Sequence, residues 1–413
     1  MTKKEKEKSM RFAAAVLGCA LLTACAQGGE EPAAGKPAPN PQIAALGDGQ
    51  AVQLKTNEPT PLGRGYCARM PYDPLNKVGI VYGACHNPGN IAQNDVWSFD
   101  AATGTWTELV KTDVRSPELK HSETGALVPK EGPPRPPGVG HTYNVICFDE
   151  GLGKMASLRG GTPPWMGGWP KKEDVEKMQT AAREAGVDLA KARLSLPWLF
   201  DVKARSWTLA APEDGDTPRH TRAEACCYDP KNKRVLYWSV DGDVANRKGG
   251  VYAYDGAANK WTFSATKGGP APGIENLCCW DSVNQRVLYF AGNYTKERVV
   301  KAFDFPSLSW TTLDAKGWPE GLKFGSGGAT LSFDASSGVG LVFVAAGDHV
   351  RVLPYDVRKE AFETEQKMSW RVGGHLMSYY DPDQNAVILM GGGDLGGTQT
   401  WAYRYKRAEE QKP

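Results

Sequence analysis

The sequence lacks the features that would place it in several large functional classes. Its apolar run Phe12 to Leu22 is too short to cross a bilayer as a stable anchor, and a mean hydropathy of −0.45 excludes a polytopic membrane protein. Outside the first 24 residues the chain is nearly neutral, so it has no electrostatic reason to bind nucleic acid. Its six histidines show no H-x-H or H-E-x-x-H spacing, which would have indicated a metal site.

The chain is instead rich in glycine, proline and large aromatic residues, with 47 Gly, 29 Pro, 13 Trp and 15 Tyr among its 413 residues. This composition predicts many turns and aromatic strands, so it favours an all-β fold over a helical bundle. Length alone suggests two or three domains, but repetitive all-β folds run longer as one unit.

The N-terminus resembles an export signal. A basic segment precedes the apolar run, which ends in Leu22-Thr23-Ala24-Cys25. This ending is similar to the lipobox of bacterial lipoproteins, which predicts lipidation of Cys25; an ordinary signal peptide with a chance cysteine is the alternative. Residues 1–24 are then the signal, and residues 25–50, rich in Ala, Pro and Gly, are a flexible tether. The protein is expected to be exported and held by this lipid alone. In a Gram-negative cell Ala26 favours the outer membrane, facing the periplasm or the cell surface.

An internal repeat runs through most of the chain. Its first half is an apolar-aromatic run ending in aromatic-Asp, a short turn and a second apolar run. Its second half is a third run ending in aromatic-Asp, with a large aromatic residue six positions after the Asp. The first half occurs at 71–83, 147–161, 227–239, 279–292, 332–347 and 379–393. The second half occurs at 96–106, 198–207, 251–261, 301–310 and 353–362, and in shortened form at 401–405.

The spacing from Asp to aromatic residue is the same in five copies. The pairs are Asp100 and Trp106, Asp201 and Trp207, Asp255 and Trp261, Asp304 and Trp310, and Asp356 and Phe362. A plain string of hairpins needs no fixed spacing. The pattern therefore predicts one four-stranded antiparallel sheet per repeat, in which the Asp caps the turn between strands and the aromatic residue packs between neighbouring sheets.

This pattern resembles the kelch repeat, and so a kelch-type β-propeller like the central domain of galactose oxidase. The resemblance covers about residues 66–407, and the family's paired glycines survive clearly at Gly160-Gly161 and Gly391-Gly392. It implies an all-β, six-bladed propeller over 51–407 and a tail at 408–413. The blades are expected at 66–109, 141–209, 220–266, 274–313, 326–365 and 373–407, the last closed by an N-terminal strand at 51–55.

Two insertions interrupt the period. Residues 110–140 contain Pro-Pro-Arg-Pro-Pro-Gly and are expected to form a long surface loop. Residues 162–196 fall inside blade 2 and contain a stretch that favours a small helix, with Val175, Met178 and Ala182 on one side.

In such a blade, the loop entering the first strand and the loop after the second strand lie at the same end of the central channel. Several residues of this mouth are candidates for ligand binding; packing alone is the alternative, since loops are polar in all proteins. The histidines among them are His141, His220 and His375 before first strands, and His86 and His349 after second strands. The others are Arg69, Arg159, Trp165 and Trp169.

The resemblance leaves two functions open. The first is a binding module, a monomer that recognises a carbohydrate ligand or an envelope protein. The second is an enzyme similar to the kelch-like sialate mutarotases, which need no metal. Its acid, base and carboxylate-binding candidates are Glu224, Glu275, Arg222 and His220.

Cofactor chemistry has little support in the sequence. A copper oxidase similar to galactose oxidase is disfavoured, because the chain contains no Tyr-His pair. No cofactor is therefore expected, although His141, His220 and His375 would suit copper or zinc if they converged on the axis.

Export would place the cysteines in an oxidising compartment, where disulfides are the default. Aligned on the aromatic-Asp, Cys147, Cys227 and Cys279 share one position, and Cys226 and Cys278 share the position before it. Neighbours in a strand point to opposite faces, so Cys147–Cys226 and Cys227–Cys278 are self-consistent bridges between blades. Cys226–Cys279 is the alternative if the side chains point the other way, and buried free thiols are another. Cys67 and Cys85 flank one hairpin and form a third candidate pair.

Overall fold

The structure is a computed structural model. The part of the chain that it describes belongs to one unit, Pro39–Pro413. It comprises residues 39–83, 85–86, 91–92, 94–111, 119–121, 127–129, 132–133, 135–136, 142–158, 197–210, 216–218, 225–238, 249–269, 276–291, 298–320, 322, 328–372, 375–392 and 398–406. No helix within these residues is long and apolar enough to cross a membrane.

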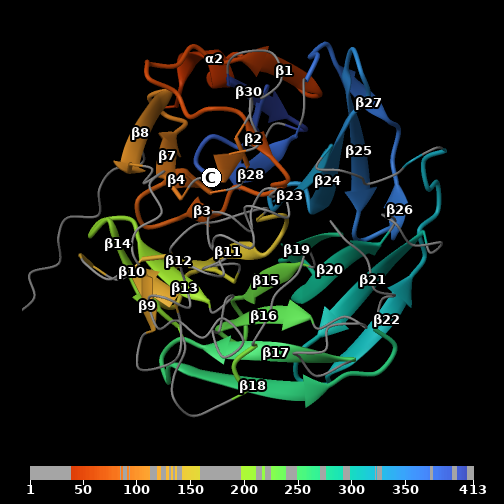
Figure 1. The fold of residues 1–413 in the computed structure, drawn as a ribbon. Coiled ribbons are helices and arrows are strands. Elements are labelled where there is room, and N and C mark those ends of the chain that lie inside the picture. The colour runs from red at the N-terminus through yellow and green to blue at the C-terminus, as the bar shows by residue number, and fades with distance from the viewer. Residues whose placement is uncertain are drawn as a thin grey trace, which may run out of the picture. The chain divides into compact units, whose positions relative to one another are not determined.

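Six antiparallel sheets, one for each repeat, are arranged in a ring (Figure 1). Blade 1 contains β3 (Tyr72–Asp73), β4 (Val78–Tyr82), β7 (Val96–Asp100) and β8 (Thr105–Val110). Blade 2 contains β11 (Ile146–Asp149), β12 (Lys154–Ser157), β13 (Trp198–Asp201) and β14 (Ser206–Leu209). Blade 3 contains β15 (Cys226–Asp229), β16 (Arg234–Trp238), β17 (Gly250–Asp255) and β18 (Lys260–Ala265).

The remaining three blades complete the ring. Blade 4 contains β19 (Leu277–Asp281), β20 (Arg286–Ala291), β21 (Val299–Asp304) and β22 (Ser309–Leu313). Blade 5 contains β23 (Ala329–Asp334), β24 (Val339–Ala345), β25 (Val350–Asp356) and β26 (Ala361–Phe362). Blade 6 contains β28 (Met377–Asp381), β29 (Ala386–Gly391), β30 (Gln399–Arg404) and β1 (Gln50–Gln53). Each first strand contacts the first strand of the next blade, and β28 contacts β3. The predicted six-bladed β-propeller is confirmed.

The N-terminal strand β1 completes the sixth blade by pairing with β30, which removes an exposed sheet edge. Arg404, at the end of β30, donates hydrogen bonds to Leu46 O (2.8 Å) and Gln384 O (3.0 Å). The two ends of the propeller are therefore joined by a backbone ladder and by one buried guanidinium.

The residues before β1 also pack on the propeller. Asn40 caps the short helix α2 (Pro41–Ala44), and its side-chain amide donates to Ala101 O of blade 1 (2.9 Å). Ile43 is completely buried between blades 6 and 1. The boundary that the sequence analysis places between tether and propeller at residue 50 is thus too late, because residues 39–50 belong to the packed structure.

The turn aspartates cap their turns as predicted. Asp73 Oδ1, for example, accepts hydrogen bonds from the backbone amides of Leu75 (2.9 Å) and Asn76 (3.1 Å). The same bond occurs after every first strand and after the third strands of blades 1 to 5. In each turn the residue four positions after the Asp has a positive φ, as a tight turn with a left-handed residue requires. These residues are Lys77, Gly104, Gly153, Arg205, Lys233, Asn259, Gln285, Leu308, Gly338, Glu360 and Asn385.

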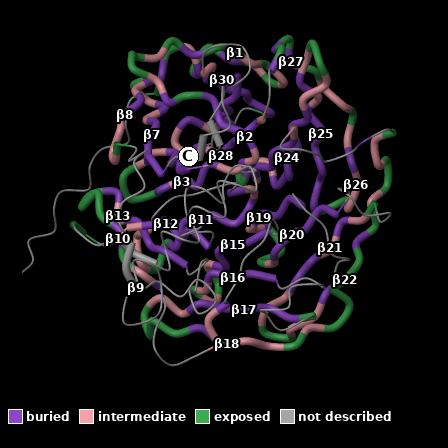
Figure 2. The backbone as a smooth tube through the Cα atoms, viewed as in Figure 1, coloured by how far each residue is buried: buried purple, intermediate pink, exposed green. Residues whose placement is uncertain are grey.

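The aromatic residue six positions after the Asp is buried between two blades, which confirms its predicted role. Trp207 of blade 2 lies 4.6 Å from Tyr82 of blade 1 and 4.8 Å from Phe200 of its own blade, measured between ring centroids. Six buried apolar clusters result, one between each pair of neighbouring blades. Figure 2 shows that the inner and middle strands are mostly buried, whereas the outer turns are exposed.

Some segments add to the six blades. β9 (Leu119–His121) and β10 (Leu127–Pro129) form a hairpin within 110–140, so the prediction of a plain loop there is wrong. The proline content hid two short strands that pair their backbone groups with each other. A small sheet of β2 (Arg64–Gly65), β5 (Cys85–His86) and β6 (Ile91–Ala92) accompanies blade 1, and β27 (Gln366–Met368) pairs with β25. The helix expected within 162–196 lies outside the described residues.

Candidate functional site

Most of the residues nominated for the channel mouth lie outside the described part of the chain. These are His141, Arg159, Trp165, Trp169, His220, Arg222, Glu224 and Glu275. His86 is described only by its backbone, in β5. The mutarotase-like site and the three-histidine metal site therefore stay predictions. Arg69, His349 and His375 are described, and each lies in a different environment.

Arg69 crosses the centre of the propeller. Its Nη1 donates to Cys226 O (2.6 Å) and Ile146 O (3.4 Å), and its Nη2 donates to Cys278 O and lies 3.4 Å from Cys278 Sγ. The guanidinium thus satisfies carbonyls of the first strands of blades 2, 3 and 4. Its hydrogen bonds are made inside the propeller instead of being offered to a ligand at the mouth.

Two other polar contacts link blades across the centre. Asn144 Nδ2 of blade 2 donates to Asn276 O of blade 4 (2.7 Å). Thr330 Oγ1 of blade 5 donates to Ala68 O of blade 1 (2.6 Å). Because neither pair joins neighbouring blades, these side chains and Arg69 close the centre at this level.

Tyr66, Tyr143 and His375 gather at the end of the axis where the chain enters the first strands of blades 1, 2 and 6. The ring centroids of Tyr66 and His375 are 4.7 Å apart, and those of Tyr66 and Tyr143 are 6.2 Å apart. Both tyrosines have positive φ, 57° for Tyr66 and 44° for Tyr143. This conformation costs about 1–2 kcal/mol in a residue other than glycine. Strained residues of this kind cluster at functional sites, so we define these three side chains as the mouth cluster.

A buried ion pair holds the segment that carries Tyr66. Arg64 binds Asp95 through two hydrogen bonds, Nη1 to Oδ1 (3.0 Å) and Nη2 to Oδ2 (2.7 Å). Trp97 Nε1 also donates to Asp95 Oδ2 (2.8 Å). Arg64 and Asp95 are both buried, and a buried pair with two matched hydrogen bonds orients the chain firmly.

The amide of Asn276 adds a polar group near the entry end. Asn276 lies five residues before the turn Asp of blade 4, the register position that Asn144 has in blade 2. Its side chain is fully buried, and no described residue hydrogen-bonds to its oxygen or nitrogen. A buried amide without a partner costs about 1–3 kcal/mol, which a ligand's hydrogen bond would recover.

His349 lies on the turn between β24 and β25, and its side chain contacts the neighbouring Asp348 instead of the mouth cluster. Its Nδ1 is 2.7 Å from Asp348 Oδ1, and this hydrogen bond lowers the pKa of the exposed Asp348 carboxyl. Within the described residues no group of three or more His, Cys, Asp or Glu side chains is arranged to hold a metal ion.

Cys147, Cys226, Cys227, Cys278 and Cys279 are buried free thiols, and Cys67 is buried as well. Their side chains take the first of the two orientations considered. Cys147 and Cys226 share the core between blades 2 and 3, and Cys227 and Cys278 share the core between blades 3 and 4. Cys279 lies between blades 4 and 5, away from Cys226.

The register around Cys67 differs from the expected one. Asp73 pairs with Val78 as assumed, but Cys85 lies opposite Gly65 instead of beside the partner of Cys67. The chain between β2 and β3 leaves its own blade, because Ala68 N bonds Tyr143 O (3.1 Å) of blade 2. Cys67, next to Ala68, therefore forms a parallel backbone bridge with Tyr143 of blade 2. This register disfavours a disulfide between Cys67 and Cys85.

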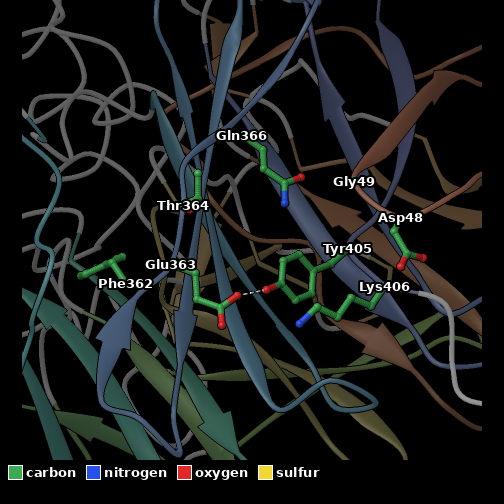
Figure 3. Close-up of a pocket in the computed structure, with 8 residues that line it drawn as sticks. All are labelled: Asp48, Gly49, Phe362, Glu363, Thr364, Gln366, Tyr405 and Lys406. Carbon is green, nitrogen blue, oxygen red and sulfur yellow. Dashed lines mark hydrogen bonds between the residues drawn. The ribbon is translucent and has the colours of Figure 1, made fainter.

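A pocket of about 880 Å³ lies away from the axis, where blade 5 meets blade 6 (Figure 3). Glu363 accepts a hydrogen bond from the Tyr405 hydroxyl and pairs with Lys359 (2.7 Å), so its charge is compensated internally. The pocket is open to solvent, and nothing in the sequence pointed to it. Its lining residues are Asp48, Gly49, Phe362, Glu363, Thr364, Gln366, Tyr405 and Lys406.

Sequence reasoning missed Tyr66, Tyr143 and Asn276. In a sequence, glycine or asparagine normally indicates a residue with positive φ. Positions 66 and 143 hold tyrosine, so the sequence contains no such indication there. The one available signal was position, since all three lie in entry segments between five and seven residues before a turn Asp.

Comparison with known proteins gives little further information. No family model matches the chain, and no curated protein sequence matches it. One solved structure with similarity is titled "Kuenenia stuttgartiensis Hydrazine Synthase", at 9% sequence identity and a TM-score of 0.33. The match covers 48% of this chain and 49% of that chain, so this chain spans about half the length of that protein. At this level of similarity it carries no argument about function.

Proposed function

We propose that this protein is an exported, lipid-anchored propeller of the kelch type that binds a carbohydrate ligand or an envelope protein at the entry end of its axis. The observation that carries the proposal is the mouth cluster of Tyr66, Tyr143 and His375. Its rings offer faces on which a sugar ring or an apolar side chain packs. The unpartnered amide of Asn276 supports the same end of the axis, because a ligand there gains a hydrogen bond. The proposal requires no metal or cofactor.

The anchor is supported by Leu22-Thr23-Ala24-Cys25. Expression of the full chain in a bacterial host with a fatty-acid label tests it. The wild-type protein is expected to be labelled and to partition into detergent, and Cys25→Ala to lose both properties. Equal labelling of the two proteins would contradict lipidation at Cys25.

Binding is tested by a thermal-shift screen of the full chain against neutral and acidic sugars. A ligand at a hundred times its dissociation constant stabilises the folded state by roughly 2.7 kcal/mol, which is readily measured. We expect His375→Ala and Tyr143→Ala to lose the shift and His349→Ala, the matched control, to keep it. A shift retained in all three variants places the site elsewhere. Turnover of a sugar acid would instead support the enzyme with Glu224, Glu275, Arg222 and His220.

A further inference from the structure

Four buried thiols form two pairs that bridge neighbouring blades. Cys147 of β11 and Cys226 of β15 share the buried core between blades 2 and 3. Cys227 of β15 and Cys278 of β19 share the buried core between blades 3 and 4. Since Cys226 and Cys227 are consecutive, a single strand meets a thiol partner on each side.

The inner strands approach each other closely at this level. Cys226 N donates to Asn144 O (2.9 Å), and Asn144 forms a parallel bridge with Ala225, so β15 is paired to blade 2 just before the thiols. On the other side, Cys278 Sγ donates to Cys226 O at 3.0 Å. A disulfide needs Cα atoms within about 7 Å of each other, and the Asn144–Ala225 bridge brings β15 this close to blade 2.

Arg69 distinguishes the two thiols of the second pair. Burial by itself raises the pKa of Cys278, but the hydrogen bond with Cys227 and the charge of Arg69 outweigh it and lower the pKa to about 7. The hydrogen bond with Cys278, together with burial, raises the pKa of Cys227 well above its usual value. The thiolate is the nucleophile in thiol–disulfide exchange, so Cys278 attacks first and Cys227 follows.

We propose that Cys147–Cys226 and Cys227–Cys278 close as two disulfide bonds that join blades 2, 3 and 4 along their inner strands. The oxidant is a small or protein disulfide, R–S–S–R, and the structure shows the dithiol form. The Cys278 thiolate attacks one sulfur and releases R–S⁻; the Cys227 thiol then loses its proton, attacks Cys278 Sγ and releases the second R–S⁻. Two protein thiols and one R–S–S–R thus yield one protein disulfide and two R–SH, with both electrons passing to the oxidant. Cys147 and Cys226 close by the same exchange. The exchange takes place as the inner strands of blades 2 to 4 pack around Arg69, when the partner thiols face each other and the oxidant still has access. The inference is independent of the proposed binding function.

Peptide mapping tests the pairing. The full chain is unfolded, refolded in a buffer of reduced and oxidised glutathione, alkylated under denaturing conditions and digested without reduction. We expect Cys279 to be alkylated, and Cys147, Cys226, Cys227 and Cys278 to be found as cross-linked peptides. Cys147→Ser should release Cys226 for alkylation and leave Cys227–Cys278 intact. Cys278→Ser should release Cys227 alone, and Cys279→Ser, the control, should leave both bonds. Alkylation of all four paired thiols in the wild-type protein, or a Cys226–Cys279 cross-link, would overturn the proposal.

The effect of a reductant on the Tm separates the cross-links from packing effects. Reductant should lower the Tm of the oxidised wild-type protein by at least about 4 °C and leave the Tm of a Cys147→Ser/Cys278→Ser variant unchanged. Equal sensitivity of the two proteins contradicts the proposal.

Arg69 acts here as a positioning residue. Arg69→Gln should raise the pH midpoint for closure of Cys227–Cys278 by about one unit, with Cys147–Cys226 as the internal control. The groups that face Cys278 from the packed elements are Arg69, Cys226, Cys227 and Cys279. An unchanged midpoint overturns the assigned order of attack. Should the variant fail to fold, thiolate absorbance of the reduced wild-type protein against Cys278→Ser decides the same point, since equal absorbance near neutral pH contradicts it.

Discussion

At the centre of the propeller, the first strands of blades 2 to 4 and those of blades 5 and 6 carry different side chains at the same register positions. In blades 2 to 4, the two positions before the aromatic-Asp hold the thiol half: Cys147, Cys226, Cys227, Cys278 and Cys279. In blades 5 and 6 the corresponding positions hold Ser332 and Ser378, whose hydroxyls are 2.8 Å apart, with Thr330 Oγ1 also 2.8 Å from Ser378. We call these three the hydroxyl half.

The same arrangement of inner strands is therefore stabilised in two ways: by hydrogen bonds between hydroxyl groups, and by the guanidinium of Arg69. Hydroxyl groups donate and accept good hydrogen bonds, so the hydroxyl half links its blades through its own side chains. Thiols are weak donors and acceptors, so the thiol half needs the guanidinium of Arg69, inserted from blade 1, to satisfy its inner carbonyls. The four predictions below test this comparison.

The largest effect is expected for Arg69→Met, which keeps the length of the side chain and removes its donors. The carbonyls of Ile146 and Cys278 would lose the guanidinium, and Cys226 O would keep only the weak thiol donor of Cys278, at about 1–3 kcal/mol for each carbonyl left dry. We expect a loss of at least about 3 kcal/mol in the free energy of unfolding, measured in urea. Arg371→Met, at an exposed arginine, is the control and should change it little. Similar values for both variants would show that Arg69 does not hold the thiol half.

Ser378→Ala tests the hydroxyl half in the same assay. The buried Ser378 hydroxyl serves both Thr330 and Ser332, and its removal leaves Ser332 without that partner. We expect a loss of about 2 kcal/mol, which is smaller than for Arg69→Met because Thr330 still bonds Ala68 O. Ser336→Ala, on an exposed turn, is the control. A loss as large as that of Arg69→Met would remove the distinction between the halves.

The turn carboxylate of blade 6, Asp381, should make the stability of the protein depend on pH. Burial, with the charges of Asp383 and Asp100, raises the pKa of Asp381 to about 6. The folded state then binds this proton more tightly than the unfolded chain. Its contribution to the free energy of unfolding therefore rises by about 1 kcal/mol as the pH falls from 7 to 5.

Urea unfolding of the wild-type protein and Asp381→Asn at both pH values isolates this contribution, because the two proteins differ in this one side chain. The asparagine still accepts the turn's backbone hydrogen bonds. The wild-type protein should gain more stability on acidification than the variant. An identical gain would show that Asp381 titrates as an ordinary aspartate.

The smallest effect is expected in the turns, where the halves are alike. Lys233 of blade 3 has φ 53° and an exposed side chain, and Gly338 holds the same turn position in blade 5. Lys233→Gly should stabilise by about 0.5 kcal/mol, since relief of the left-handed strain exceeds the entropy cost of glycine. Gly338→Lys should destabilise, and thermal unfolding measures both. Changes of the same sign would contradict this account.

Much of the fold could be predicted because its signals are local. The aromatic-Asp pairs marked the strand ends, and the spacing of six brought each large ring back onto the third strand. The cysteine alignment also gave the thiol pairs that face each other, since it needs only the twofold alternation of a strand and the register set by the turn Asp. The hairpin within 110–140 was missed because its strands are short and lie among prolines.

The candidate site was less predictable. Arg69 was assigned to the mouth from its place in an entry loop, but the irregular chain between β2 and β3 carries it to the axis. Arg69 lies four residues before the turn Asp of its blade, a position where the other five blades hold uncharged residues. This difference was the one sign in the sequence that Arg69 has a special place. The mouth cluster joins residues more than 300 positions apart, so no local pattern could connect Tyr66 to His375.

The sequence by itself determined the turns, the strand register and the aromatic residues that separate the blades, because each depends on a few neighbouring residues. Only the tertiary structure decided where Arg69 and the mouth tyrosines lie and how Asn40, β1 and Arg404 close the ring. These features depend on distances between blades around a closed circle. Such distances exist only once all six blades have packed.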